Sequence, residues 1–131
     1  MEQEQTAGKK RVLVVEDDKF LGELLARRME QEGLNFVLKK SGEDGVAEAK
    51  ANPPDLILLD LLLPGIDGYE VLSQLKKDST LSRIPVIVLT NLGQKAEQDK
   101  AFDLGATAFM VKAESDLDDI VKAVKSFKGF A

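Results

Sequence analysis

The chain has 131 residues, of which 44% are hydrophobic and 31% charged, and its formal net charge is −5. This length and composition predict one globular domain, and the scattered Lys and Arg residues exclude a basic surface that would bind nucleic acid directly. Cysteine and histidine are absent, which excludes disulfides, ordinary zinc sites and nucleophilic sites of the Ser/His/Asp or Cys/His type.

The first ten residues, 1–10, are polar and carry no secretory signal. We therefore expect a flexible N-terminal tail, followed by a single domain over 11–128. No apolar run approaches the ~20 residues needed to cross a bilayer. These features predict no membrane partner and fit a cytoplasmic protein, as does the absence of cysteine.

Five short apolar runs alternate with five amphipathic segments, which predicts βα units on a parallel sheet. In chain order the runs are Val12–Glu16, Asn35–Lys39, Leu56–Asp60, Val86–Thr90 and Ala108–Lys112. The first, third and fourth are continuously apolar, as expected of central strands that helices cover on both faces. The second is more polar, so we place it at an edge of the sheet.

Capping signals and apolar spacing predict the five helices between and after these strands. The first helix is expected to end near Gly33, and Ser41 with Asp44 has the form of a capping box that opens the second. The fourth helix, Gln94–Leu104, is mostly polar and precedes Gly105, a residue suited to a left-handed cap. The clearest helical repeat marks the fifth helix and consists of Leu117, Ile120, Val121, Val124 and Phe127.

Polar residues close four of the five runs, and in a parallel sheet these closing residues meet at one edge. They are Glu16-Asp17-Asp18, Asp60, Thr90-Asn91 and Lys112. Carboxylates gathered there repel one another unless a cation compensates them, and Mg²⁺ prefers such oxygen ligands. Lys112 and the Thr90 hydroxyl would then bind phosphoryl oxygens while the Asp60 carboxylate attacks phosphorus and forms an acyl phosphate.

Each of these residues also has a plain structural interpretation. Asp18 is expected to cap the first helix, Thr90 is common in strands, and Phe109 by itself is more typical of a packing residue. Lys112 alone could be a surface lysine or a partner for one of the acids. Asp60 is different, because an acid that closes a wholly apolar strand is costly unless it is paired or bound.

Together, these segments resemble the receiver domains of bacterial response regulators, over about 11–127. The resemblance implies an α/β fold: a doubly wound five-stranded parallel sheet in the order 2-1-3-4-5, with five helices. It also implies that Asp60 is the phosphoacceptor. Glu16 and Asp17 match the acidic pair that, with Asp60, holds Mg²⁺, and Leu62 would add its backbone carbonyl.

By the same resemblance, Lys112 binds the phosphoryl group, Thr90 is the switch hydroxyl, and Phe109 is an aromatic rotamer switch. Two positions depart from the family pattern. Ala113 follows Lys112 where the family usually has a proline in a cis peptide bond, a geometry that costs ~3 kcal/mol before other residues. Asn91 replaces the small residue that usually follows the switch Thr.

Leu62 and Leu92 occupy positions that modulate autodephosphorylation in the family, two residues after Asp60 and Thr90. Both side chains are apolar here and neither can orient the attacking water. We therefore hypothesise that the acyl phosphate is long-lived.

The resemblance implies a phosphoacceptor rather than an enzyme, with only Mg-dependent self-phosphorylation and autodephosphorylation. The phosphodonor would be a sensor histidine kinase or a histidine phosphotransfer protein that docks near the first helix. A downstream protein or a second copy of the chain would bind the face formed by 94–104, 108–112 and 117–127. Whether the chain acts alone or belongs to a larger protein stays open.

Three other functions compete with this interpretation. A phosphatase of the haloacid dehalogenase-like class needs a second Asp two residues after the nucleophile, where this chain has Leu62. A flavin-binding protein needs a phosphate loop after the first strand, and the acids at 16–18 would repel the flavin phosphate. The main alternative is a receiver-like interaction module that works without phosphorylation.

Overall fold

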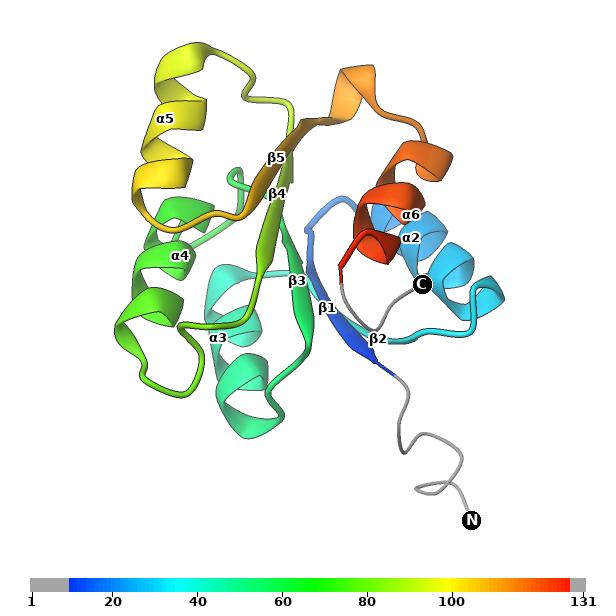
Figure 1. The fold of residues 1–131 in the computed structure, drawn as a ribbon, viewed down its shortest axis with the longest axis horizontal. Helices are drawn as coiled ribbons and strands as arrows, with labels where there is room; N and C mark the ends of the chain where they lie inside the picture. Colours follow the sequence, from blue (N-terminus) through cyan, green and yellow to red (C-terminus); the bar gives the residue numbers. More distant parts are fainter. Residues whose placement is uncertain (1–9, 128–131) are drawn as a thin grey trace.

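Five parallel strands form the centre of the protein, in the order β2-β1-β3-β4-β5. The computed structural model describes residues 10–127 (Figure 1). The strands are β1 (Arg11–Val15), β2 (Asn35–Lys39), β3 (Leu56–Leu59), β4 (Val86–Thr90) and β5 (Ala108–Val111). The predicted sheet order and the edge position of the second strand are confirmed. Of the predicted tail, 1–10, all but Lys10 lies outside the described residues, as does position 128.

Three predicted strands extend one residue too far at their carboxyl ends, because the strands end at Val15, Leu59 and Val111 rather than at Glu16, Asp60 and Lys112. The first strand also begins one residue earlier than predicted, at Arg11. The backbone amides of the two acids are still paired. Glu16 N donates to Lys39 O at 2.9 Å and Asp60 N donates to Val15 O at 3.1 Å. Each acid therefore carries the last amide hydrogen bond of its strand, which fixes where its side chain begins.

Helices cover both faces of the sheet, two on one face and three on the other (Figure 1). On one face lie α2 (Lys19–Gln31) and α6 (Leu117–Lys125). On the other lie α3 (Gly42–Ala51), α4 (Gly68–Lys77) and α5 (Lys95–Asp103). A 3₁₀ turn that the sequence does not predict, η1 (Lys112–Glu114), joins β5 to α6.

Successive side chains of β1 pack alternately into two separate hydrophobic cores. Val12 and Val14 pack with the α2 and α6 side, whereas Leu13 and Val15 pack with α3, α4 and α5. All four side chains are at most 2% exposed. Complete burial of such a side chain is worth about 1.5 to 3 kcal/mol, so the two cores together hold the strand ends in place.

The predicted helix caps are present. The Asp18 side chain accepts from Leu21 N at 3.1 Å at the start of α2, and the Ser41 hydroxyl accepts from Asp44 N at 3.1 Å at the start of α3. Gly33 and Gly105 have φ values of 77° and 107°, a backbone region that favours glycine. Both glycines lie just after the ends of α2 and α5.

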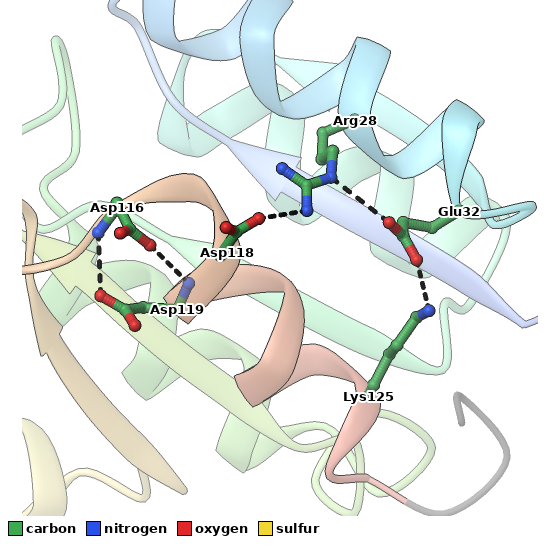
Figure 2. Close-up of polar contacts among 6 residues, drawn as sticks. All are labelled: Arg28, Glu32, Asp116, Asp118, Asp119 and Lys125. Carbon is green, nitrogen blue, oxygen red and sulfur yellow. Dashed lines mark hydrogen bonds and ion pairs between the residues drawn. The ribbon is translucent and has the colours of Figure 1, made fainter.

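A chain of alternating charges links α2 to α6 (Figure 2). Arg28 Nε lies 3.3 Å from Glu32 Oε2, and the same guanidinium binds Asp118 in the first turn of α6. Glu32 also binds Lys125 in the last turn of α6. This row of ion pairs therefore lies alongside the apolar contact between the two helices.

Candidate functional site

Two buried carboxylates, Glu16 and Asp60, lie at the carboxyl edge of the sheet. They follow the neighbouring strands β1 and β3, and they are only 3% and 4% exposed. Asp17, the next residue after Glu16, is exposed. We call these three carboxylates, Glu16, Asp17 and Asp60, the acidic pocket, of which two are buried and one is exposed.

Lys112 forms an ion pair with each of the two buried acids. Its Nζ lies 2.7 Å from Glu16 Oε1 and 2.8 Å from Asp60 Oδ2. Lys112 opens η1, directly after β5, so that the sheet order brings it to the same edge as the two acids. The sequence leaves open a partnership with one acid, and the structure shows that Lys112 contacts two.

The second oxygen of each buried carboxylate accepts from a backbone amide. Asp18 N donates to Glu16 Oε2 at 3.0 Å, and Leu62 N donates to Asp60 Oδ1 at 3.1 Å. These two amides are groups of the site that the sequence did not predict. Their only signal is position, because each lies two residues after its acid. Every oxygen of the two carboxylates is therefore oriented.

Burial and ion pairing oppose one another in this pocket. Burial raises the pKa of the Glu16 carboxyl, and the hydrogen bonds from Lys112 and from the Asp18 amide oppose that rise only in part. Burial alone would lower the pKa of Lys112, but its hydrogen bonds to Asp60 and Glu16 outweigh burial and leave the pKa above its ordinary value. Lys112 is therefore a stable cation of the site.

The acidic pocket fits a divalent metal ion. Glu16, Asp17 and Asp60 each offer a carboxylate oxygen, and these oxygens lie within 4.8 Å of one another. Oxygen-only donors suit hard cations such as Mg²⁺, which keeps several water ligands and needs only a few protein oxygens. The exposed Asp17 leaves one side of the group open to solvent.

The other predicted site residues are Thr90, Phe109 and Leu62. Thr90 ends β4, is fully buried, and its Oγ1 accepts from Leu92 N at 3.4 Å. Phe109 is half-buried on β5, with its ring centroid 6.4 Å from that of Phe102 on α5. Leu62 is 53% exposed. The structure thus joins Glu16, Asp17, Asp60 and Lys112 directly, while the hydroxyl of Thr90 is engaged elsewhere.

The turn after Lys112 departs from the geometry that a family proline would give. Residues 10–127 contain no cis peptide bond, so the bond between Lys112 and Ala113 is trans. The chain instead enters η1 at this point.

The family model of the response regulator receiver domain matches residues 12–125. The chain therefore belongs to the response regulator receiver domain family. Such domains are phosphoacceptors of two-component systems rather than ordinary enzymes. They bind a divalent metal at the acidic pocket and interact with histidine kinases or phosphotransfer proteins and with downstream effectors, and the Glu16, Asp17 and Asp60 group fits that metal.

Several characterised relatives share this similarity. The chain is 33% identical over 122 residues to the polar-differentiation response regulator DivK of Brucella ovis, which covers 93% of this chain and 98% of DivK. It is 34% identical over 116 residues to the DNA-binding dual master transcriptional regulator RpaA of Synechocystis sp., which covers 88% of this chain and 48% of RpaA. The chain thus spans about half the length of RpaA.

Solved structures agree with the sequence relatives. The Mn²⁺-bound form of the response regulator Rcp1 superposes with a TM-score of 0.81 at 30% identity, covering 90% of this chain and 93% of Rcp1. A response regulator from Chloroflexus aurantiacus superposes with a TM-score of 0.84 at 28% identity, covering 90% of this chain and 96% of that protein. Within the described residues, no helix is long and apolar enough to span a bilayer.

Proposed function

We propose that this chain is a phosphoacceptor that takes a phosphoryl group on Asp60, in a Mg²⁺-dependent reaction, from a histidine kinase or histidine phosphotransfer protein. The observation that carries the proposal is the environment of the Asp60 carboxylate. Asp60 is buried at the end of a central strand, 2.8 Å from the ammonium of Lys112 and within 4.8 Å of carboxylate oxygens from Glu16 and Asp17.

In the proposed reaction, a carboxylate oxygen of Asp60 attacks phosphorus. A new P–O bond forms as the P–N bond of the donor phosphohistidine breaks, and the electron pair of that bond returns to the imidazole nitrogen. The attacking carboxylate oxygen already carries the lone pair that forms the new bond, so the step needs no proton acceptor. The Leu62 amide holds Oδ1 of Asp60 by a hydrogen bond of 3.1 Å and so orients the nucleophile.

Lys112 is proposed to neutralise the phosphoryl oxygens. In the structure its ammonium is shared between Glu16 and Asp60, so it already stands beside the nucleophile. A fixed cation that needs no reorganisation stabilises the charge that develops on the transferred group.

Glu16, Asp17 and Asp60, with the backbone carbonyl of Leu62, are the residues proposed to hold Mg²⁺. When bound, such an ion neutralises phosphoryl oxygens as a Lewis acid. The chain's own contribution is to keep the buried carboxylates apart and oriented, through the amides of Asp18 and Leu62.

Thr90 and Phe109 are proposed to convert phosphorylation into a change of surface. The Thr90 hydroxyl would exchange its 3.4 Å contact with Leu92 N for a phosphoryl oxygen. Phe109 lies on β5 beside α5, so its rotation would alter the face formed by α5, β5 and α6. That face is the proposed binding surface for a downstream protein or a second copy of the chain.

We further propose that 11–128 is the functional unit and that the protein works in the cytoplasm. The family's exchange of phosphoryl groups with histidine kinases and phosphotransfer proteins supports this location.

Mass spectrometry of the intact chain tests the proposal. Wild type, Asp60→Asn and Asp60→Ala are incubated with acetyl phosphate and Mg²⁺, with a chelator in a parallel sample. One added phosphoryl group is expected on the wild type with Mg²⁺ only, and none on either variant. No adduct on the wild type would favour the interaction module that works without phosphorylation, and an adduct on Asp60→Asn would move the acceptor to another residue.

A further inference from the structure

The loop between β3 and α4, residues 60–67, contains the proposed phosphoacceptor Asp60 and the Leu62 amide that orients it. Hydrogen bonds within the loop region hold its two ends. Near the beginning, Gly68 N donates to Leu61 O at 3.0 Å. At the end, the Asp67 side chain accepts from Glu70 N at 2.9 Å and caps α4. The second half of the loop is also held from elsewhere in the chain.

Glu43, in the first turn of α3, supplies that contact. Its Oε2 accepts from Ile66 N at 3.2 Å, across 23 positions of sequence. Ser41 caps the same helix, and the cap fixes the backbone from which the Glu43 side chain extends. The part of the loop that precedes α4 is therefore bound to the helix that follows the edge strand β2.

Two glycines make room for this contact. Gly65 has a φ of 72°, and a Cβ there would lie 2.6 Å from Glu43 Oε1. A Cβ at Gly42 would lie 2.6 Å from Ile66 Cγ1 and 2.8 Å from Ile66 O. The carboxylate of Glu43 thus occupies space that any other residue at position 65 would fill, so helix and loop fit closely.

We propose that Glu43 is a positioning residue for the acidic pocket, because it fixes, through the Ile66 amide, the loop on which Asp60 and Leu62 depend. This inference rests on the proposed function, since it concerns the loop that orients Asp60. Release of Ile66 lets the second half of the loop move, and the Leu62 backbone, which orients Asp60 Oδ1 and is proposed to hold Mg²⁺, then loses its fixed position. Mutation of a residue that orients metal ligands without binding the metal typically lowers the metal affinity by roughly 10- to 100-fold.

A simpler role for Glu43 would be to complement the dipole of α3 as a first-turn acid. Asp44 provides the matched control, because it is the other acid of that first turn. Asp44 lines a different groove, together with Lys39 and Glu48. Loss of either acid removes the same charge from the helix start, but only loss of Glu43 frees Ile66.

The test compares Glu43→Ala, Glu43→Gln and Asp44→Ala in the full chain. Calorimetric titration with Mg²⁺ is expected to show affinity about tenfold weaker for Glu43→Ala, the lower end of the range for orienting residues. Glu43→Gln, whose amide oxygen still accepts from Ile66, and Asp44→Ala should bind like the wild type. Hydrogen exchange of the Ile66 amide in metal-free protein should be faster in Glu43→Ala only.

Three results would overturn the inference. The first two are a Glu43→Ala variant that binds Mg²⁺ as the wild type does, and an equal loss of Mg²⁺ affinity in Glu43→Ala and Asp44→Ala. Glu43→Gln as weak as Glu43→Ala would also overturn it, because charge rather than the hydrogen bond would then be responsible. Failure of the proposed function is seen separately, as a wild type that neither binds Mg²⁺ nor accepts a phosphoryl group. Glu43 is exposed, so these substitutions leave the core intact.

Discussion

The ammonium of Lys112 lies 2.8 Å from the carboxylate of Asp60, although 52 positions separate the two residues in the sequence. The same ammonium lies 2.7 Å from Glu16. One cation is therefore shared by two buried carboxylates before any metal ion or phosphoryl group arrives, and this sharing has measurable consequences.

Replacement of Lys112 should separate metal binding from phosphoryl transfer. Lys112→Met removes a positive charge that repels Mg²⁺ and competes for its oxygen ligands, so Mg²⁺ affinity is expected to rise, by roughly tenfold or more. Phosphorylation by acetyl phosphate should slow by at least about 100-fold, because a fixed cation at the transferred group is lost. Calorimetry and intact-mass time courses measure the two effects.

Lys100→Met is the control for this prediction, because Lys100 lies on α5, over the ring of Tyr69. It should change neither the Mg²⁺ affinity nor the rate. A Lys112→Met variant that binds Mg²⁺ more weakly than the wild type would show that the ammonium does not compete with the ion.

The side chain at position 62 should set the lifetime of the acyl phosphate. Leu62 is 53% exposed beside Asp60 and has no polar group to orient water. Leu62→Asn is expected to accelerate loss of the phosphoryl group, by at most about 100-fold, because an amide can hold the attacking water. The decay of the phosphorylated mass with Mg²⁺ present measures this. Rapid decay in the wild type, unchanged in Leu62→Asn, would contradict the hypothesis.

The charge chain between α2 and α6 should make stability depend on pH. The hydrogen bond from Lys125, followed by that from Arg28, lowers the pKa of Glu32, and the hydrogen bond from Arg28 lowers the pKa of Asp118. Groups with a lowered pKa in the folded state stabilise it above their unfolded pKa, and this contribution is lost as pH falls through the folded pKa. Urea unfolding is therefore expected to require less denaturant in acid.

Arg28→Gln should weaken the dependence of stability on acidic pH. It should also weaken the dependence of stability on salt, because salt screens the ion pairs between α2 and α6. Arg27→Gln, on an exposed neighbour in the same helix, is the matched control and should keep the wild-type dependence. Identical pH profiles for the two variants would argue against a role of Arg28 in stability.

Substitution of Gly68 tests whether close packing or helix propensity has the larger effect on stability at the start of α4. Alanine favours helices over glycine by at most about 1 kcal/mol. A Cβ at position 68 would, however, lie 2.6 Å from Leu61 Cα and 3.0 Å from the Asp60 carbonyl carbon, and such overpacking costs about 1 to 3 kcal/mol. Gly68→Ala should therefore lower the free energy of unfolding, whereas Lys77→Ala on the exposed part of α4 should not. A more stable Gly68→Ala would show that the loop yields.

Local patterns in the sequence determined the elements and most of the pocket's members. Runs of buried residues, the edge character of 35–39 and the capping signals at Asp18 and Ser41 depend on neighbours within a few positions, and each is present in the structure. The acids and Lys112 were predictable because parallel strands bring their carboxyl ends to one edge.

Tertiary structure alone decided the partners. The sharing of Lys112 by two acids, the contact between Glu43 and the Ile66 amide, and the pairing of Arg28 with Asp118 each join distant segments. Sequence periodicity reports which face of an element is buried, but it carries no information on side-chain rotamers or on loop paths. Those depend on how the helices pack against the completed sheet, and so they appear only when the whole chain is folded.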